Sequence, residues 1–331
     1  MKANQKRRTL VAAACAGVAM TFGSLGAMAA DFPDRPARLI VPFPPGGATD
    51  ILGRLLAESM SRTLKQQVIV ENRPGANTII GASEAARSKP DGYTMFLAAG
   101  STLVLNPLLY KTLAYDPARD FRILDVVGEV PLIVVVPNSS PSKNLAEFVQ
   151  QARKEDGRIN YGSVGTGSTL HLAAELFGSA AKAKMTHVPY KGSAAAMTDL
   201  IGGQIDAIFD AYSTAYPQVQ GGKIRALAVT SEKRLDTLPD VPTVSESVPD
   251  YRAIVWYAVV VPQGVPDAVA QTLKGALGTA FKDAGFRQAA EKAGFIVGQT
   301  RSDAEIKRYV DDENRRWSAL IKAQNIQLEN N

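Results

Sequence analysis

The amino-acid sequence predicts an α/β protein of two domains that face each other across a cleft. Apolar runs of strand length alternate with segments of helical spacing along the chain, and this alternation is typical of α/β layers with mostly parallel sheets. A strand, a Gly-rich loop and an amphipathic helix follow one another twice, which suggests one such unit in each domain. The length of 331 residues, 46% of them hydrophobic, is enough for two domains that bury their own cores.

Residues 1–30 are predicted to be a signal peptide that is removed from the mature protein. The first eight residues include four Lys or Arg side chains, Leu10–Leu25 is mostly apolar, and Ala27-Met28-Ala29 has the small residues of a cleavage site. A membrane anchor is disfavoured because the apolar stretch is short and interrupted. Lipoprotein attachment at Cys15 is disfavoured because little apolar sequence precedes it. The general and the twin-arginine export routes both stay open.

The mature chain is predicted to have a nearly neutral surface and no thiol chemistry. The whole sequence has 37 Lys and Arg against 32 Asp and Glu. Four of the basic residues and none of the acidic ones fall in residues 1–30, which leaves 33 against 32. This balance favours neither nucleic acid nor a membrane surface as a partner. The single cysteine, Cys15, also lies in the leader, so no disulfide is expected.

Nine apolar runs are predicted to be strands. Between them, Leu52, Leu56, Met60 and Leu64 recur at every fourth position, which is the spacing of one buried helix face. No repeat with a fixed short period occurs. The predicted strands are Arg38–Val41, Val68–Val70, Tyr93–Ala98, Leu132–Val136, Ile159–Ser163, Thr186–Pro189, Ile205–Asp210, Ile224–Thr230 and Ile254–Val261.

The first strand–loop–helix unit has the features of an anion-binding site. After the strand Leu39–Val41, Gly46 and Gly47 allow the backbone to approach a ligand closely, and Thr49 or Asp50 can cap the following helix. The first N–H groups of a helix lack intrahelical partners and attract negative charge. Because the loop contains no Lys, His, Cys or Ser, we expect it to bind an anion rather than to transform one. A plain strand–helix connection is the alternative.

The second unit, Ile159–Phe177, offers backbone N–H groups and the hydroxyls of Thr166 and Ser168 to an anion. A P-loop would need a Lys after the glycines, and a dinucleotide fingerprint would need Gly where Leu170 stands. An ordinary capped helix start is the alternative. Two such units, each at the carboxyl end of a strand, suit a small ligand held between two lobes.

Catalytic and metal sites are disfavoured. Ser168, His171 and Asp210 could form a triad, but the nucleophile-elbow pattern G-x-S-x-G is absent. His171 and His187 are the only histidines, so no cluster of metal ligands and no cofactor is expected. Asp210 ends a predicted strand at the edge where ligand groups gather, and a cap for the next segment is its alternative role.

Several residues near the two loops are assigned simpler roles. Ser193 is expected to cap a helix, and Lys191 to be a solvated charge. Arg54 lies too deep on the first helix to reach a ligand. Phe43 and Tyr212 can form an aromatic wall of the pocket, with plain packing as the alternative.

Eight segments of the chain occur in the order seen in one known family. They are VPFPPGGATDILGRLLAE, VENRPGA, PDGYTMFLA, YGSVGTGSTLHLAAELF, THVPYKGSAAAMTDLIGGQIDAIFD, GGKIRALAVTSEKR, LPDVPTVSE and WYAVVVPQGVP. From Asp31 to its C-terminus the chain therefore resembles the substrate-binding receptors of tripartite tricarboxylate transporters, often called Bug receptors. It departs from the family pattern at Asn77-Thr78, where a Gly pair is usual, at Tyr212 in a segment that usually has Asn-Leu, and at Ala258, where Gly is frequent.

The resemblance implies a two-lobed periplasmic-binding-protein fold (type II-like), with the ligand cleft between two α/β domains. The chain of this fold crosses between the lobes twice, and we place the crossings near Glu129–Leu132 and Pro249–Ile254. Lobe one is then residues 31–130 plus 253–331, and lobe two is residues 131–252.

The resemblance also implies a function, namely an exported periplasmic protein that captures a small carboxylate and delivers it to the membrane subunits of a transporter. The ligand is expected to be a di- or tricarboxylate, an acidic amino acid or an aromatic acid, and the protein a monomer. An enzyme on the same fold (a hydrolase or transferase) and a receptor for a signalling sensor are the alternatives. The implied ligand-binding residues are Phe43, Pro44, Gly46, Gly47, Ala48, Thr49, Asp50, Gly165, Thr166, Gly167, Ser168, His171, Asp210 and Tyr212.

Overall fold

The computed structural model describes residues 32–249 and 251–323 of the chain. The predicted signal peptide, residues 1–30, lies outside these residues, as does Asp250 in the second predicted crossing. Residues Arg35–Asn331 group into one compact unit. Within the described part of the chain, no helix combines the length and the apolar character that crossing a membrane requires.

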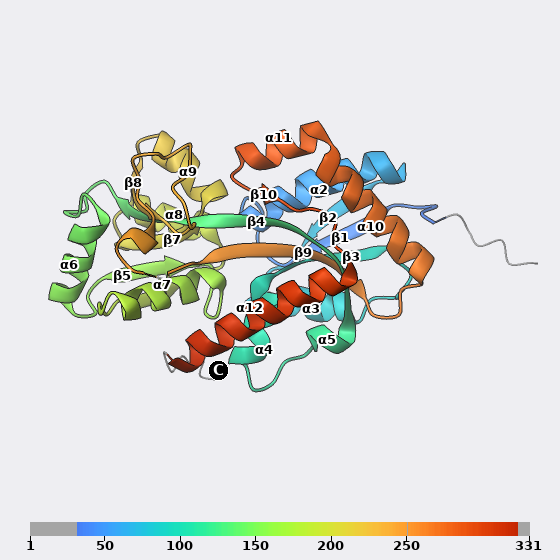
Figure 1. Cartoon of the computed structure of the whole chain (residues 1–331), viewed down its shortest axis with the longest axis horizontal. Helices are drawn as coiled ribbons and strands as arrows, with labels where there is room; N and C mark the ends of the chain where they lie inside the picture. Colours follow the sequence, from blue (N-terminus) through green and yellow to red (C-terminus); the bar gives the residue numbers. More distant parts are fainter. Residues whose placement is uncertain (1–31, 250, 324–331) are drawn as a thin grey trace, which may run out of the picture. The chain divides into compact units, whose positions relative to one another are not determined.

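The strands form one continuous mixed sheet (Figure 1). Its order is β2-β1-β3-β9-β4-β7-β5-β6, and β8 and β10 each pair with β4 outside this path. Each of the nine predicted runs coincides with a strand, whereas the short β10 was not predicted. The strands are β1 (Ala37–Val41), β2 (Val68–Asn72), β3 (Thr94–Ala99), β4 (Phe121–Pro137), β5 (Asn160–Ser163), β6 (Thr186–Pro189), β7 (Ala207–Ala211), β8 (Ile224–Val229), β9 (Ile254–Pro262) and β10 (Ile296–Val297).

The prediction of mostly parallel pairing is wrong for the centre of the sheet. The outer pairs β1–β2, β1–β3, β5–β6 and β5–β7 are parallel. In contrast, β9 is antiparallel to β3 and β4, and β4 is antiparallel to β7, β8 and β10. Each of the two central strands, β4 and β9, therefore runs antiparallel to its neighbours in the sheet, and together they connect two sets of parallel strands.

The long strand β4 changes its partner partway along its length. Residues Phe121–Pro131 pair with β9, and Leu132–Val135 pair with β7. The change falls inside Glu129–Leu132, where the sequence places the first crossing between lobes. β4 and β9 run side by side through the middle of the molecule in Figure 1. The division of the chain into two lobes at these strands stays a prediction.

Helices pack on the sheet through apolar faces of the predicted spacing. Leu52, Leu56, Met60 and Leu64 of α2 are all buried. The helices of eight or more residues are α2 (Ala48–Leu64), α3 (Ile79–Ala86), α6 (Leu145–Glu155), α7 (Thr169–Ala180), α8 (Ser193–Ile201), α9 (Tyr212–Gln220), α10 (Asp267–Lys282), α11 (Ala284–Lys292) and α12 (Asp303–Ala323). The shorter ones are the π-helix η1 (Ser101–Leu105), α4 (Asn106–Leu109), α5 (Pro117–Asp120) and the 3-10 helix η2 (Val244–Glu246).

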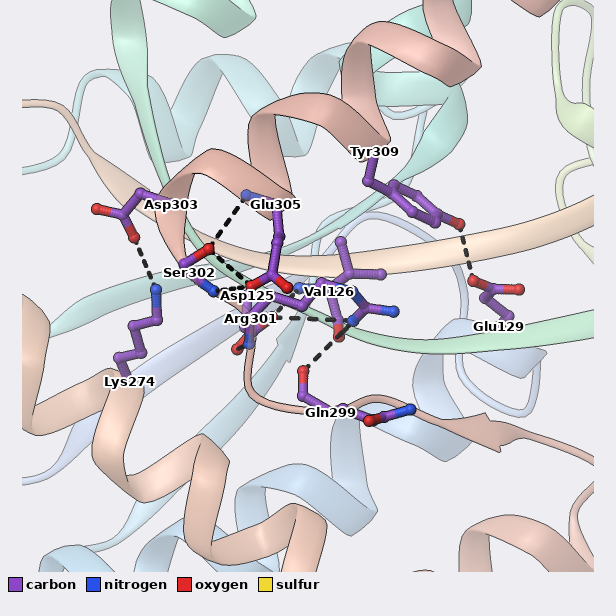
Figure 2. A network of polar contacts seen from close by, with 10 residues as sticks. All are labelled: Asp125, Val126, Glu129, Lys274, Gln299, Arg301, Ser302, Asp303, Glu305 and Tyr309. Atoms are coloured by element: carbon purple, nitrogen blue, oxygen red, sulfur yellow. Dashed lines mark hydrogen bonds and ion pairs between the residues drawn. The ribbon is translucent and has the colours of Figure 1, made fainter.

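A polar network ties the last helix, α12, to β4 (Figure 2). The buried Asp125 of β4 accepts a hydrogen bond from the Arg301 backbone N–H at 3.1 Å, and the Arg301 guanidinium donates to the Val126 carbonyl at 3.0 Å. Further along α12, the Tyr309 hydroxyl donates to Glu129 at 3.0 Å. Burial raises the pKa of Asp125, although the backbone N–H groups of Arg301 and Val126 oppose this shift. The network fixes α12 next to the strand that changes its partner.

The turn before α3 adopts a backbone that suits glycine. Ala76, Asn77 and Thr78 have φ angles of 45°, 45° and 75°, a region that β-branched residues such as Thr rarely adopt. This is one of the places where the sequence departs from the family that it resembles, in which a Gly pair is usual. Side-chain hydrogen bonds hold the turn, because Asn106 donates to the Asn77 carbonyl at 2.9 Å and Thr102 donates to the Thr78 hydroxyl at 2.8 Å.

Candidate ligand-binding site

A partly open pocket lies where loops from both sets of strands meet. Its volume is about 250 Å³, close to the lower end of small-molecule pockets at about 300 Å³. Most of its walls are apolar, and Lys191 is the one charged residue among the described residues that line it. The lining residues are Phe43, Pro44, Pro45, Gly47, Ala48, Thr49, Ala99, Ser101, Val164, Ser168, Thr169, Leu170, Lys191, Gly192, Ser193, Ala194, Ala195, Ala211, Val255 and Tyr257.

Four helices of nine or more residues begin at this pocket. The residues that precede their first turns are Gly47 for α2, Ser168 for α7, Gly192 for α8 and Ala211 for α9, and all four line the pocket. A helix N-terminus has unpaired N–H groups and about half a unit of positive charge. The N-termini of α2, α8 and α9 receive no side-chain cap. First-turn residues of α2 and α8 line the pocket, so their N–H groups are available to an anion there, whereas the first turn of α9 does not line it.

Hydrogen bonds to the Asp50 side chain fix the loop before α2. The Asp50 carboxylate accepts hydrogen bonds from the Gly46 backbone N–H at 3.0 Å, from Arg54 at 2.9 Å and from Asn72 at 2.9 Å. Asn72 also donates to the Phe43 carbonyl at 3.0 Å. The predicted capping role of Asp50 or Thr49 is therefore wrong, because Gly47 occupies the N-cap position and Asp50 folds back onto the loop.

The loop before α7 has the predicted cap. Ser168 accepts a hydrogen bond from the His171 backbone N–H at 3.3 Å. Gly165 and Gly167 have φ angles of 128° and 80°, a region that glycine adopts without strain. The Gly167 N–H donates to Nδ1 of His171 at 3.1 Å. His171 therefore lies beneath the loop and supports it, and it does not line the pocket.

A cluster of stacked rings continues below this loop. The imidazoles of His171 and His187 stack with their centroids 4.0 Å apart, and Tyr161 stacks on His187 at 5.1 Å. Nε2 of His187 lies 2.7 Å from the Ser163 hydroxyl, which also accepts a hydrogen bond from the Gly165 N–H at 3.1 Å. Burial lowers the pKa of His171 to about 3, with a contribution from His187, and burial lowers the pKa of His187 to about 4. Both rings are therefore neutral at pH 7.

Asp210 links the starts of α8 and α9 from inside the protein. It is fully buried, and its carboxylate accepts hydrogen bonds from the hydroxyls of Ser193 at 2.8 Å and Thr214 at 2.6 Å. Burial raises the pKa of Asp210, whereas these hydroxyls oppose the shift. The expectation that Ser193 caps a helix is wrong, because Gly192 is the N-cap residue and Ser193 bonds Asp210 instead. Asp210 thus positions Ser193, which lines the pocket.

Tyr212 does not form the aromatic wall that the sequence suggested for it. Tyr212 does not line the pocket. Its ring stacks on Tyr216 with the centroids 4.5 Å apart, and its hydroxyl donates to Thr237 at 2.9 Å. Tyr257 of β9 lines the pocket. Burial raises the pKa of Tyr257, and a hydrogen bond with the Thr49 side chain opposes the shift. The aromatic residue that lines the pocket together with Phe43 is thus Tyr257 and not Tyr212.

The predicted site residues divide into two groups. Those that line the pocket are Phe43, Pro44, Gly47, Ala48, Thr49 and Ser168. Those that lie behind the lining or beside it are Gly46, Asp50, Gly165, Thr166, Gly167, His171, Asp210 and Tyr212. Sequence reasoning expected helices after Lys191 and after Asp210 but did not place the starts of α8 and α9 at the pocket. Neither start is marked by a run of glycines of the kind that marks the two recognised units.

The side chains do not assemble the triad that the sequence permits. Ser168 bonds the backbone of His171, His171 bonds the backbone of Gly167, and Asp210 bonds two hydroxyls. Each side chain of the possible triad is thus directed to a structural partner. Among the described residues no group of three or more His, Cys, Asp or Glu side chains is arranged to hold a metal ion.

Several solved structures are similar to this chain over nearly all of their length. R. palustris Rpa4515, solved with adipate, is 34% identical with a TM-score of 0.87, and the match covers 90% of this chain and 99% of that chain. The periplasmic binding protein BugD is 33% identical with a TM-score of 0.85, over 90% and 100%. MatC (Rpa3494) from Rhodopseudomonas palustris, solved with bound malate, is 28% identical with a TM-score of 0.81, over 88% and 100%. The predicted periplasmic-binding-protein fold is therefore confirmed.

The fold and the pocket define a solute-binding receptor. The family model of the tripartite tricarboxylate transporter family receptors matches residues 52–326. Because this match spans most of the chain, the protein belongs to that family. The sequence-based assignment to these receptors, rather than to enzymes, is thus confirmed by the family match and by the similar ligand-bound proteins.

Proposed function

We propose that this protein captures a small carboxylate between two lobes in the periplasm and delivers it to the membrane subunits of a tripartite tricarboxylate-type transporter. The lobes are residues 31–130 plus 253–331 and residues 131–252, and the protein acts as a monomer after its signal peptide is removed. Its membership of the receptor family supports this proposal, as do the adipate and the malate held by two similar proteins.

The observation that carries the proposal is the convergence of four helix N-termini on one pocket. No Asp or Glu is among the described residues that line it, so nothing in its wall repels an anion. One carboxylate can accept hydrogen bonds from the uncapped N–H groups at the starts of α2 and α8, and from the hydroxyl of Thr49. The ligand carboxylate thus takes the position of the missing caps.

The free energy available from these contacts is sufficient for tight binding. A helix N-terminus contributes about 0.3–1 kcal/mol when exposed and up to about 2 kcal/mol when partly buried. A hydrogen bond to a charged group contributes about 1.5–3 kcal/mol. A few such contacts reach about −8 kcal/mol, which corresponds to micromolar affinity. Capture of a carboxylate therefore needs no bidentate arginine in the pocket.

The proposal is tested by placing a negative charge at the start of α8. Ala195 lines the pocket in the first turn of this helix, where an acidic residue favours folding because of the helix dipole. Ala195→Glu is therefore expected to fold well but to weaken the binding of adipate or malate at least about tenfold, by about 1.4 kcal/mol. The matched variant Ala195→Gln adds the same volume without the charge and should bind within a few fold of the wild type.

Calorimetry on refolded, ligand-free protein measures these affinities, and a thermal shift provides an independent check. An acid at a hundred times its dissociation constant should add about 2.7 kcal/mol to the free energy of unfolding. The neutral diamide of the same acid should add nothing. Equal binding by the Glu and Gln variants would contradict the anion site.

Uptake of the acid by cells that carry the wild-type protein, but not by cells with Ala195→Glu, tests the delivery step.

A further inference from the structure

We infer that Lys191 selects ligands that carry a second anionic group, so that the preferred ligand is an acid with an apolar middle and two anionic ends. This inference rests on the proposed function, because it assumes that the helix N-termini hold the first carboxylate. It assigns to Lys191 a role that the sequence analysis did not expect, since this residue was interpreted there as a solvated charge.

Lys191 is the cation of the pocket. It lies in the loop between β6 and α8, next to the N-cap residue Gly192, and it lines the cavity. Within the described part of the chain no hydrogen bond or ion pair engages its ammonium group. The nearby acids are engaged elsewhere, because Asp199 accepts from the Tyr190 hydroxyl at 2.7 Å and Asp210 accepts from Ser193 and Thr214. The charge of Lys191 is therefore available to a ligand.

The loop that carries Lys191 is pressed against the loop before α2. A Cβ atom on Gly192 would lie 3.2 Å from Cγ of Pro44, so the two loops touch where they line the pocket together. Lys191 is thus held at the junction of the two sets of strands. Its flexible four-carbon stem lets the ammonium group reach over the cavity. The exposed Lys191 directly precedes the N-cap residue of α8. Its ammonium group can therefore meet a second anionic group of a ligand whose first carboxylate lies at the helix N-termini.

The rest of the wall indicates what lies between the two anionic groups. Phe43, Val164 and Leu170 line the pocket with apolar side chains. Such walls favour an alkyl or aryl segment, because burying apolar surface is favourable and burying an unpaired charge is not. A third carboxylate on the ligand would have no further cation among the described lining residues. The arrangement therefore suits a dicarboxylate better than a tricarboxylate.

Matched pairs of acids test this inference. Calorimetry measures the affinity of the protein for adipate and hexanoate, and for glutarate and pentanoate. The two members of each pair differ in one terminal carboxylate. We expect the wild type to bind the dicarboxylate at least about tenfold more tightly, by about 1.4 kcal/mol. In Lys191→Met this preference should fall below about twofold, while the affinity for the monocarboxylate changes little. Lys191→Arg should retain the preference, and the exposed Lys223→Met serves as the matched control.

Each outcome of this experiment decides a separate point. An unchanged preference in Lys191→Met overturns the inference, because another group then reads the second anion. An equal loss for both acids also overturns it, because Lys191 then holds the common carboxylate or supports the loop. A thermal unfolding curve for each variant separates this second case from misfolding. If the wild type binds none of the four acids, the inference is overturned, because the preferred ligand is then not an acid with an apolar middle. Binding of malate separates this case from a failure of the proposed function.

Discussion

At the scale of single residues, Asp50 and Asn72 shape the pocket without lining it. Both hold the loop that carries Phe43 and Gly46 from its inner side. Burial alone would raise the pKa of Asp50, but hydrogen bonds from Arg54, Gly46 and Asn72 lower it overall. The carboxylate is therefore ionised at neutral pH. Its contribution to stability is present above the ordinary pKa of 3.8 and is lost as the pH falls further.

We predict that Asn72→Ala weakens both the fold and ligand binding. The substitution leaves the Phe43 carbonyl and one oxygen of Asp50 without their donor, and such a loss costs about 1–3 kcal/mol of the free energy of unfolding. The affinity for a carboxylate should fall as well, because the loop no longer has a fixed shape. Urea unfolding and calorimetry measure the two effects.

The matched control for Asn72→Ala is Arg62→Ala on the outer face of α2. Arg62 is half exposed and forms an ion pair with Glu58 at 2.8 Å, and a surface pair of this kind contributes at most about 1 kcal/mol. Arg62→Ala should therefore leave the ligand affinity unchanged. If Asn72→Ala binds the ligand as tightly as Arg62→Ala does, the loop does not depend on Asn72.

At the scale of elements, the start of α7 rests on two neutral imidazoles. Nδ1 of His171 must be unprotonated in order to accept from the Gly167 N–H at 3.1 Å. The pKa of His171 is about 3 and that of His187 about 4 in the folded protein, whereas both have the ordinary value of 6.5 when exposed. Below pH 6.5 the unfolded chain therefore binds protons that the folded protein does not bind. Stability should fall as the pH decreases through this window.

We predict that the free energy of unfolding falls between pH 7.5 and pH 5, with each histidine contributing up to about 2 kcal/mol. Urea unfolding at the two pH values measures the difference. Because His171 and His187 are the only histidines of the chain, the double variant His171→Gln/His187→Gln removes the imidazole contribution entirely. The carboxylates are the same in both proteins, so their contribution to the pH dependence cancels when the two proteins are compared. The same pH dependence in the wild type and in the double variant would show that the imidazoles do not matter.

At the scale of the whole molecule, contacts outside the ligand connect the two predicted lobes. Gly192 packs against the ring of Pro44, and Gly294 lies against the ring of Tyr212. The Tyr110 hydroxyl lies 3.5 Å from the Thr166 carbonyl. In each pair one residue belongs to each predicted lobe. A ligand that contacts both sides adds to these contacts and therefore favours the closed arrangement.

We predict that Gly192→Val opposes closure of the lobes. Gly192 has an extended backbone with φ of 176°, so Val fits the local chain, but its side chain meets the ring of Pro44. Overpacking of this kind costs about 1–3 kcal/mol, and this cost arises only when the lobes are together. Adipate affinity should fall accordingly. Small-angle scattering at saturating adipate should give a larger radius for Gly192→Val than for the wild type.

Gly275→Ala in α10 is the matched control for closure. A Cβ atom on Gly275 meets nothing within 4 Å, so this variant should close as the wild type does. The wild type itself should show a smaller radius with adipate than without it. Identical scattering profiles for wild type, with and without saturating adipate, would exclude closure as part of the mechanism, although the anion site could remain.

The positions of most elements could be predicted from the sequence, because they depend on neighbouring residues. The spacing of Leu52, Leu56 and Met60 identifies the buried face of α2 without reference to any other segment. The first half of β4 was missed for the opposite reason. It contains the buried Asp125, which is tolerated because the backbone N–H of Arg301, 176 residues further along the chain, donates to it. A partner at that separation leaves no local pattern.

By itself the sequence determined the α/β class, the family and two of the four helix N-termini at the pocket, because short motifs such as Gly46-Gly47 and Gly165–Gly167 are local features. Only the tertiary structure decided which side chains face the ligand. Asp210 and His171 carry the groups that a ligand site needs, but their hydrogen bonds with Ser193 and Gly167 direct them away from the cavity. Lys191, in contrast, lines the pocket because Gly192 packs against Pro44 from a distant part of the chain. The physical reason is that a helix or a turn is fixed by its own residues, whereas the lining of a pocket depends on how separate segments pack.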